Sequence, residues 1–190
     1  MEIEACKTVI HGKLTPQRYA HSIAVSQQAR LLALAWGAQT ERATQAGLLH
    51  DITKDYTREQ HLEIFEKYHI ALSDVERFSP KLWHAISGRA LLENELGIDD
   101  AEILDAVRYH TTARAGMSLL EKVIYLADFI SADRNFEGVA QLRESVAQSL
   151  DRGFLAALDF SISELVAKGS TVHIDTVNAR NEFLCANIKV

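Results

Sequence analysis

The feature that most constrains the fold is a series of amphipathic segments that open with helix-start signals. None of them alternates apolar and polar residues as a half-buried strand would. The signals are proline at the first helical position and residue pairs that fit a capping box. The first kind occurs at Thr15-Pro16 and Ser79-Pro80, and the second at Thr57 with Gln60 and Ser118 with Glu121. The chain is therefore predicted to be all-α.

Nine helical segments follow from these signals and from the apolar spacing. They are predicted at 16–36, 40–49, 58–68, 81–97, 101–110, 122–132, 138–150, 153–169 and 177–184. The sequence contains no internal repeat and no low-complexity linker. We therefore expect residues 1–190 to form a single all-α domain of eight to ten helices.

The composition restricts the class of function. A chain of 190 residues suits one well-buried core, and 47% hydrophobic with 24% charged residues is typical of a globular protein. The net charge of −6 argues against nucleic acid as the main partner but permits a small phosphorylated substrate. The start has no apolar signal region, no segment is long enough to span a membrane, and Cys6 and Cys185 are the only cysteines. We expect a cytoplasmic location.

Polar residues that interrupt apolar helical stripes are the best functional signal. His21 shares a stripe with Val25, His50-Asp51 ends an apolar run, and Asp128 lies beside Ile124. Each has a structural alternative: a hydrogen-bonded core histidine, a helix end, or an aspartate that caps or pairs with an arginine. A buried aspartate is costly unless it is paired or bound to metal. Together, imidazole and carboxylate groups on separate helices favour a first-row divalent ion.

Two further histidines occupy similar positions. His110 ends a helix whose inner face carries Val107, and His84 shares its face with Gly88, which we expect to admit another backbone. The remaining histidines show no such placement, and we predict His11, His61 and His69 to be ordinary surface or core residues.

With these residues in view, the sequence resembles a known family. The pattern His21…His50-Asp51…Asp128 resembles the signature of the HD-domain metal-dependent phosphohydrolases. The blocks "LLHDITKD", "AVRYHTTARAGMSLLEKVIYLADFI" and "VHIDTVNARN" narrow the resemblance to the YqeK-type symmetrical diadenosine tetraphosphate hydrolases. The resemblance covers nearly the whole chain, and it implies an HD-domain helical bundle.

The resemblance also implies a metal centre. His21, His50, Asp51 and Asp128 would bind the first ion, and His84 with His110 would lie near a second metal position or a phosphate. Iron is the expected metal, as one or two ions, and manganese, cobalt, zinc and magnesium are compatible with the same ligands. A bound ion would lower the pKa of a coordinated water and so supply hydroxide for attack on phosphorus.

The resemblance further implies a substrate site for a small-molecule dinucleotide. Asp51, Lys54, Asp128 and His110 would be catalytic. The substrate-binding set would be Arg18, His21, Lys54, His84, His110, Thr111, Arg134, Thr171, Asp175, Thr176 and Arg180. The C-terminal segment, about 170–190, would pack near the nucleotide, and a homodimer is compatible with the family. If the helix continues past Asp51, Lys54 lies one turn further on and can reach a ligand of the metal.

Other activities use similar residues. A nucleotidase or nucleoside triphosphate hydrolase would keep the site and change the substrate. A di-iron oxygenase or a non-catalytic nucleotide-binding module is a more distant alternative. Lys54 could instead be solvated beside Asp55, and Arg134 could pair with Glu137. The chain departs from the family pattern at Ala113, Ser131, Ala132, Glu137 and Ile174, and none of these is a candidate ligand.

Overall fold

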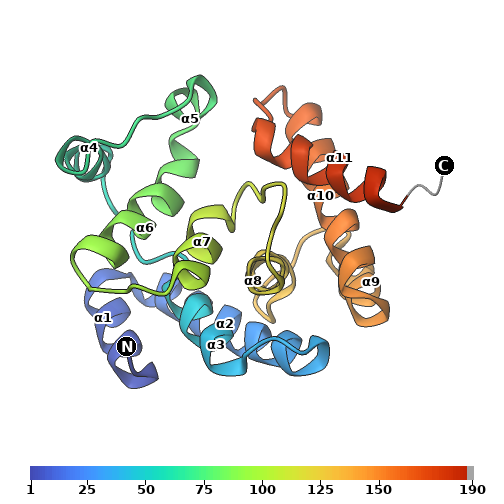
Figure 1. The fold of residues 1–190 in the computed structure, drawn as a ribbon, viewed down its shortest axis with the longest axis horizontal. Helices are drawn as coiled ribbons and strands as arrows, with labels where there is room; N and C mark the ends of the chain where they lie inside the picture. Colours follow the sequence, from blue (N-terminus) through green and yellow to red (C-terminus); the bar gives the residue numbers. More distant parts are fainter. Residues whose placement is uncertain (188–190) are drawn as a thin grey trace.

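The computed structural model describes residues 1–187, and every regular element in that range is helical (Figure 1). The elements are α1 (Ile3–Lys13), α2 (Pro16–Trp36), α3 (Thr40–Leu49), α4 (Arg58–Lys67), α5 (Asp74–Phe78), η1 (Pro80–Leu82), α6 (Trp83–Asn94), α7 (Ala101–Tyr109), α8 (Leu119–Ile130), α9 (Val139–Gln148), α10 (Leu150–Ala167) and α11 (Ile174–Asn187). The predicted all-α class is confirmed. Residues 188–190 of the predicted C-terminal segment lie outside the described range.

The described range contains eleven α-helices, two more than the nine predicted segments. The additional helices are α1 and the short α5, which opens with a capping box between Ser73 and Glu76. The capping boxes predicted at Thr57 and Ser118 are both formed. Local hydrogen bonds therefore define the starts of α4, α5 and α8.

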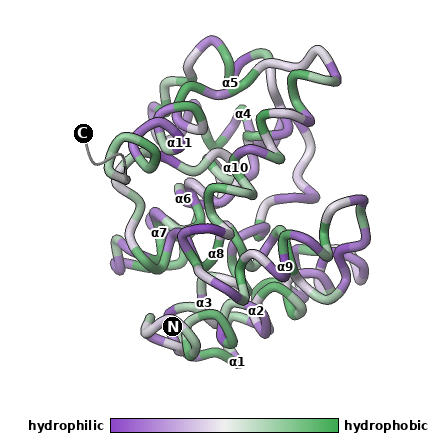
Figure 2. Tube along the Cα trace, turned by 90° about the vertical axis from the view of Figure 1, so that its right-hand side faces the viewer, coloured by the Kyte–Doolittle hydropathy of each residue, from purple (hydrophilic) through white to green (hydrophobic). Residues whose placement is uncertain are grey.

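Helix α8 lies at the centre of the bundle. It packs against α2, α3 and α7 on one side and against α9 and α10 on the other, and Figure 1 shows it nearly end-on between these groups. The colour in Figure 2 changes every few residues along most helices, as expected for amphipathic helices around a shared core. No helix within residues 1–187 is both long and apolar enough to cross a lipid bilayer.

The close contact between α2 and α3 depends on Gly47. A Cβ at this position would lie 2.7 Å from the Cα of Ser26, a distance that real side chains do not adopt. The contact brings the end of α3 against the helix that carries His21. At Gly88, where we expected a close backbone, the nearest atoms are side-chain atoms at 3.5 Å, an ordinary packing distance.

Helix α3 ends at Leu49, and the chain turns through residues 50–55. The predicted end of this helix at residue 49 is confirmed, and the condition under which Lys54 would lie one helical turn past Asp51 is not met. Lys54 still returns toward Asp51, because its N–H donates to the Asp51 carbonyl at 2.8 Å within the turn. In a helix, adjacent side chains point about 100° apart, so the turn is what lets two neighbouring residues face one interior site.

Candidate metal centre

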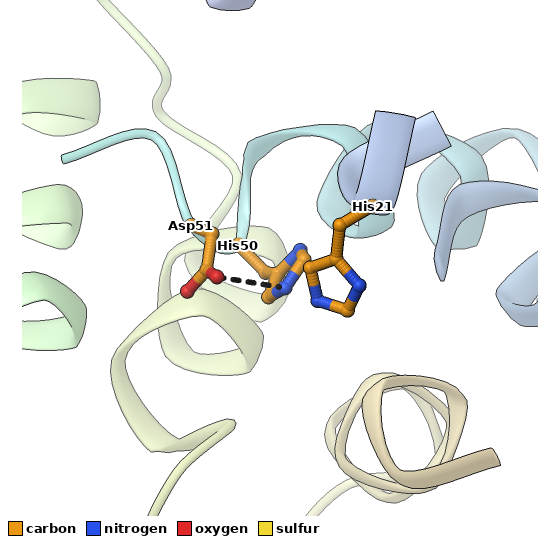
Figure 3. Close-up of side chains that lie close together, drawn as sticks. All are labelled: His21, His50 and Asp51. Atoms are coloured by element: carbon orange, nitrogen blue, oxygen red, sulfur yellow. Dashed lines mark ion pairs between the residues drawn. The ribbon is translucent and has the colours of Figure 1, made fainter. Parts of the chain in front are cut away.

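Side chains from five parts of the fold converge at one buried position. His21 comes from α2, His50 and Asp51 from the turn after α3, and His84, His110 and Asp128 from α6, the end of α7 and α8. Three overlapping groups of these residues bring ligand atoms within 4.8 Å of one another: His21, His50 and Asp51; His50, His110 and Asp128; and Asp51, His84 and His110. Figure 3 shows the first group, in which the three side chains face one another.

His50 and His110 are oriented by the helices that they end. Each follows the last residue of its helix, and its Nδ1–H donates to the carbonyl three residues earlier. The distances are 2.8 Å from His50 to Gly47 and 2.7 Å from His110 to Val107. A carbonyl only accepts, so Nδ1 carries the proton and Nε2 presents a lone pair. This arrangement is typical of histidines that bind metal.

His21 is oriented by a carboxylate that the sequence did not indicate. Its Nδ1 lies 2.7 Å from Asp133, and its Nε2 lies 3.0 Å from the Asp128 carboxylate. Burial alone would lower the pKa of His21, but the two carboxylates outweigh it and raise the pKa. Asp133 therefore holds the ring so that Nε2 faces the centre.

At the middle of the centre, carboxylate and imidazole atoms lie close together, and two of them form no hydrogen bond. Asp51 Oδ1 lies 3.1 Å from His84 Nε2 and 3.3 Å from His110 Nε2, and His50 Nε2 lies 3.6 Å from Asp51 Oδ2. Asp51 Oδ1 and His50 Nε2 are buried, and neither forms a hydrogen bond. Converging acceptor atoms of this kind repel one another unless a cation lies between them. The donor set fits a divalent ion.

The protonation states also fit metal ligands. Burial lowers the pKa of both His50 and His84 to about 4, so both rings are neutral at pH 7. Burial alone would raise the pKa of both Asp51 and Asp128, but it is outweighed at Asp51 by His50, His110 and His84. At Asp128 it is outweighed by His21, His50 and Arg134, so the pKa of both carboxyl groups is lowered and both stay ionised. Neutral imidazole and ionised carboxylate are the forms that coordinate a metal.

Lys54 lies at the rim of the centre. Its ammonium is 3.0 Å from His84 Nε2 and 3.5 Å from Asp51 Oδ1. The alternative of a solvated lysine paired with Asp55 does not describe the structure, because the Asp55 carboxylate accepts the N–H of Thr15 at 2.7 Å.

Two arginines complete the positive rim. Arg134 donates to the Asp128 carboxylate through Nη2 and to the Asp128 carbonyl through Nε, the latter at 2.7 Å. Its partner is Asp128 rather than the predicted alternative, Glu137. Arg18 Nη1 lies 3.9 Å from Asp51 Oδ2 and is partly exposed. The rim therefore offers cations to an anion that approaches the buried ligands.

The remaining predicted substrate residues lie around the C-terminal segment. Thr111, Thr171 and Thr176 line a hollow of about 440 Å³, which we call the tail hollow. The Thr176 hydroxyl donates to the Thr112 carbonyl at 2.7 Å, and this bond fixes the start of α11 beside the residues that follow His110. Asp175 and Arg180 are not lining residues of this hollow. Arg180 instead pairs with Asp159 on α10, which neutralises its charge.

The departures from the family pattern lie outside the ligand set. Ala113 is buried and has a φ of 55°, a left-handed conformation that glycine adopts at lower cost. Ala132, Glu137 and Ile174 are exposed, and the Ser131 carbonyl accepts from Arg143 at 2.8 Å.

A family model described as the HD domain matches residues 18–133, a span that contains every candidate metal ligand. This match covers more than half of the chain. The chain belongs to the HD-domain family.

Two curated relatives extend the similarity beyond this span. A protein of Bacillus subtilis (strain 168) named "Bis(5'-nucleosyl)-tetraphosphatase, symmetrical" is 37% identical over 93% of this chain and 94% of its own length. A protein of Halalkalibacterium halodurans with the same name is 34% identical over 93% of this chain and 94% of its own length. The chain belongs with these relatives inside the HD-domain family.

A solved structure supports the same placement. It is described as a predicted HD superfamily hydrolase involved in NAD metabolism, from Clostridium acetobutylicum. It superimposes with a TM-score of 0.93 at 35% identity and covers 98% of this chain and 99% of its own. The fold of this HD-domain chain is therefore shared along nearly its entire length.

Two residues that shape the HD-domain site had no signal in the sequence. Asp133 orients His21 but lies in a loop with no apolar periodicity. Arg143 donates to the carbonyls of Ile130, Ser131 and Arg134, at 2.8 to 3.1 Å, and so holds the loop that carries Asp133. Both act through contacts between separate elements, which local sequence patterns do not report.

Proposed function

We propose that this chain hydrolyses diadenosine tetraphosphate symmetrically, using one water to release two ADP. The observation that carries the proposal is the convergence of buried lone pairs, with Asp51 Oδ1 and His50 Nε2 unpartnered, beneath a rim of three cations. Relatives named for this activity align with nearly the whole chain.

The ion would be held by His21, His50, Asp51 and Asp128, and a second ion by Asp51 with His84 and His110. We propose iron for these positions, and manganese, cobalt, zinc or magnesium would suit the same donors. When bound, such an ion supplies an activated water and a Lewis acid for phosphoryl oxygens.

The residues of the chain bind and orient the phosphates. Lys54, Arg18 and Arg134 offset the charge on the leaving phosphate, and the planar fork of Arg134 can contact two of its oxygens. Arg134 would reach a phosphate by giving up part of its contact with Asp128. The tail hollow, with hydroxyls from Thr111, Thr171 and Thr176, would hold one nucleoside. Asp175 and Arg180 would support the segment that forms its wall.

Hydrolysis of diadenosine tetraphosphate to two ADP needs no reactant other than one water. The water oxygen forms a bond to one of the two middle phosphorus atoms. The bond between that phosphorus and the central bridging oxygen breaks, the bridging oxygen leaves with the other ADP, and the protons of the water pass to the solvent. Asp51, Asp128 and His110, which surround the proposed ion, are the catalytic groups beside Lys54.

The proposal also includes a homodimeric assembly, a cytoplasmic location and a single domain over residues 1–190.

The products test the cleavage position. The metal-loaded protein is incubated with diadenosine tetraphosphate in ¹⁸O-water, and the nucleotides are analysed by mass spectrometry. We expect ADP as the only nucleotide product, with label in one ADP per turnover. AMP with ATP would indicate an asymmetric cut, release of free phosphate would indicate a nucleotidase or triphosphate hydrolase, and dependence on oxygen would indicate an oxygenase.

A rim variant tests the role of the cations. Lys54→Ala should retain its metal, measured by elemental analysis, because Lys54 is not a ligand. Turnover should fall by roughly 10- to 1000-fold, the range for removal of one preorganised charge. If metal content fell in step with activity, Lys54 would be structural and its proposed contact with phosphate would be wrong.

A further inference from the structure

A second hollow opens beside the metal centre. Its volume is about 460 Å³, close to the 440 Å³ of the tail hollow, and the two share Pro80 and Lys81 as lining residues. Lys54 and His84, which contact each other at the rim of the metal centre, also line it. Both volumes lie in the range of about 300–1,000 Å³ that is usual for small-molecule sites. We call it the aromatic hollow, because its lining includes the rings of Tyr56, His61 and Trp83.

The aromatic hollow is positively charged in a chain of net charge −6. Arg18, Lys54, Arg58 and Lys81 line it, and its described lining residues include no aspartate or glutamate. Local cations in an acidic protein concentrate anions at that one surface. Because Lys54 belongs to both the hollow and the metal centre, a phosphate chain on the ion can continue into this hollow.

The rings and Arg58 provide a surface for a planar base. The Arg58 guanidinium lies 4.9 Å from the ring centre of Trp83, and the rings of Tyr56 and His61 lie 6.0 Å apart. The Trp83 N–H already donates to the Glu76 carbonyl at 2.6 Å, so Trp83 supports Arg58 and does not bind the ligand by hydrogen bonds. Bases stack readily on guanidinium planes and aromatic rings.

His61 has one nitrogen available to a ligand. The Ser87 hydroxyl donates to the Trp83 carbonyl at 3.0 Å, and the Thr53 hydroxyl donates to the His84 carbonyl at 2.8 Å. Because the hydroxyl protons of Ser87 and Thr53 already form these hydrogen bonds, His61 Nδ1–H is the donor to Ser87 Oγ, at 2.8 Å. Burial lowers the pKa of His61, so the ring is neutral and Nε2 is an acceptor, with no partner among the described residues.

We propose that the aromatic hollow binds the second nucleoside of the dinucleotide. Its base stacks on Arg58 and Tyr56, and an exocyclic amine donates to His61 Nε2. Lys81, which lines both hollows, contacts the phosphate chain between the two halves. The aromatic hollow includes Lys54 and His84 of the metal centre, and the tail hollow includes Thr111, next to His110, so each half of a symmetrical dinucleotide can extend from the ion into one hollow. This inference rests on the proposed function, which it deepens by assigning a site to each half.

A truncated substrate tests the assignment. Adenosine 5'-tetraphosphate has the same phosphate chain but lacks the second nucleoside. We expect Arg58→Ala and His61→Phe each to lower kcat/KM for diadenosine tetraphosphate by about 10-fold, as for loss of one base contact, and to lower kcat/KM for the truncated substrate by a clearly smaller factor. His61→Phe keeps the ring and removes the acceptor. Arg77→Ala is the matched control, because Arg77 is an exposed arginine that lines neither hollow.

An equal loss for both substrates, or no loss for the dinucleotide, would overturn the assignment. Titration calorimetry with ADP separates this result from a failure of the proposed function, because it does not depend on turnover. The metal-loaded wild-type protein should bind one ADP in each hollow, and Arg58→Ala should lose the site in the aromatic hollow. A single ADP site in the wild type would contradict the assignment. Two ADP sites in a protein that does not hydrolyse the dinucleotide would support nucleoside binding in the aromatic hollow and reject the proposed activity.

Discussion

Within residues 1–187, two buried groups of histidine and carboxylate side chains differ in how their charges are satisfied. In the first, which we call the tail cluster, Glu76 accepts from Arg108 at 2.5 Å and from the N–H of Ser73 at 2.8 Å. His173 Nε2 lies 3.7 Å from the same carboxylate. Each oxygen of Glu76 thus has a donor supplied by the chain, and the cluster joins α5, α7 and the segment before α11.

The metal centre contains more histidines but lacks such donors at its middle. Its cations, Lys54, Arg18 and Arg134, lie at the rim and remain partly exposed. Asp51 Oδ1 and His50 Nε2 at the inside have no hydrogen-bond partner. The comparison shows that buried imidazoles and carboxylates do not by themselves mark a ligand site. The distinguishing feature is the carboxylate: each oxygen of Glu76 accepts a hydrogen bond from the chain, whereas Asp51 Oδ1 accepts none.

Asp51→Ala should have the largest effect on function and little effect on folding. Asp51 belongs to two of the three ligand groups, so its loss removes a donor from both proposed ion positions. We expect loss of bound metal and of activity, measured by elemental analysis and product assay, with an unchanged helical circular dichroism spectrum. Full metal occupancy with normal turnover would remove the distinction between the two clusters.

Glu76→Gln should destabilise the fold and leave metal binding unchanged. The amide can still cap Ser73, but Arg108 loses its charged partner, and breaking a buried pair costs on the order of 3 kcal/mol. We expect a lower free energy of unfolding in urea with normal metal content. A variant that lost metal without losing stability would show that the tail cluster belongs to the metal site.

The same variant gives a test of pH dependence. His173, the capping contacts with Ser73 and the charge of Arg108 outweigh burial and lower the pKa of Glu76 to about 2, from an ordinary 4.5. Its ionised form therefore stabilises the fold above pH 4.5, and this contribution is lost as the pH falls toward 2. The stability difference between wild type and Glu76→Gln should be largest near neutral pH and shrink below pH 4.5. A constant difference would mean that the charge of Glu76 is not the cause.

Asp133→Ala should weaken the metal centre without removing a ligand. Loss of a carboxylate that orients a metal-binding histidine lowers metal affinity by about 10- to 100-fold. The affinity is measured by competition with a chelator. Glu137→Ala is the control, because it removes the same charge from an exposed position in the same loop. Equal affinities in both variants would show that the contact of Asp133 with His21 has no role in binding.

His173→Asn should have the smallest effect. At 3.7 Å, His173 makes a weaker contact with Glu76 than Arg108 does, so we expect a loss of about 1 kcal/mol or less in unfolding free energy. Metal content should not change. A loss as large as that of Glu76→Gln would make His173 a principal member of the tail cluster.

The sequence by itself determined the helical architecture and the identities of the residues that converge. Capping boxes at Thr57 and Ser118 and the proline at position 16 act within one helical turn, so they are readable without knowledge of the rest of the fold. The candidate ligands were visible because each interrupts an apolar stripe, and such stripes point to the core. The short α5 was missed although its capping box is of the same local kind.

Only the tertiary structure decided how those residues meet. The turn through residues 50–55 directs His50 and Asp51 to one side, and the contact of Gly47 with Ser26 sets the spacing to His21. The pairing of Arg134 with Asp128, rather than with Glu137, and the support of His21 by Asp133 likewise depend on how elements pack. The physical reason is that capping boxes and helix-start prolines act through interactions within one turn of a helix. The orientation of a buried side chain depends on the atoms that other helices bring against it.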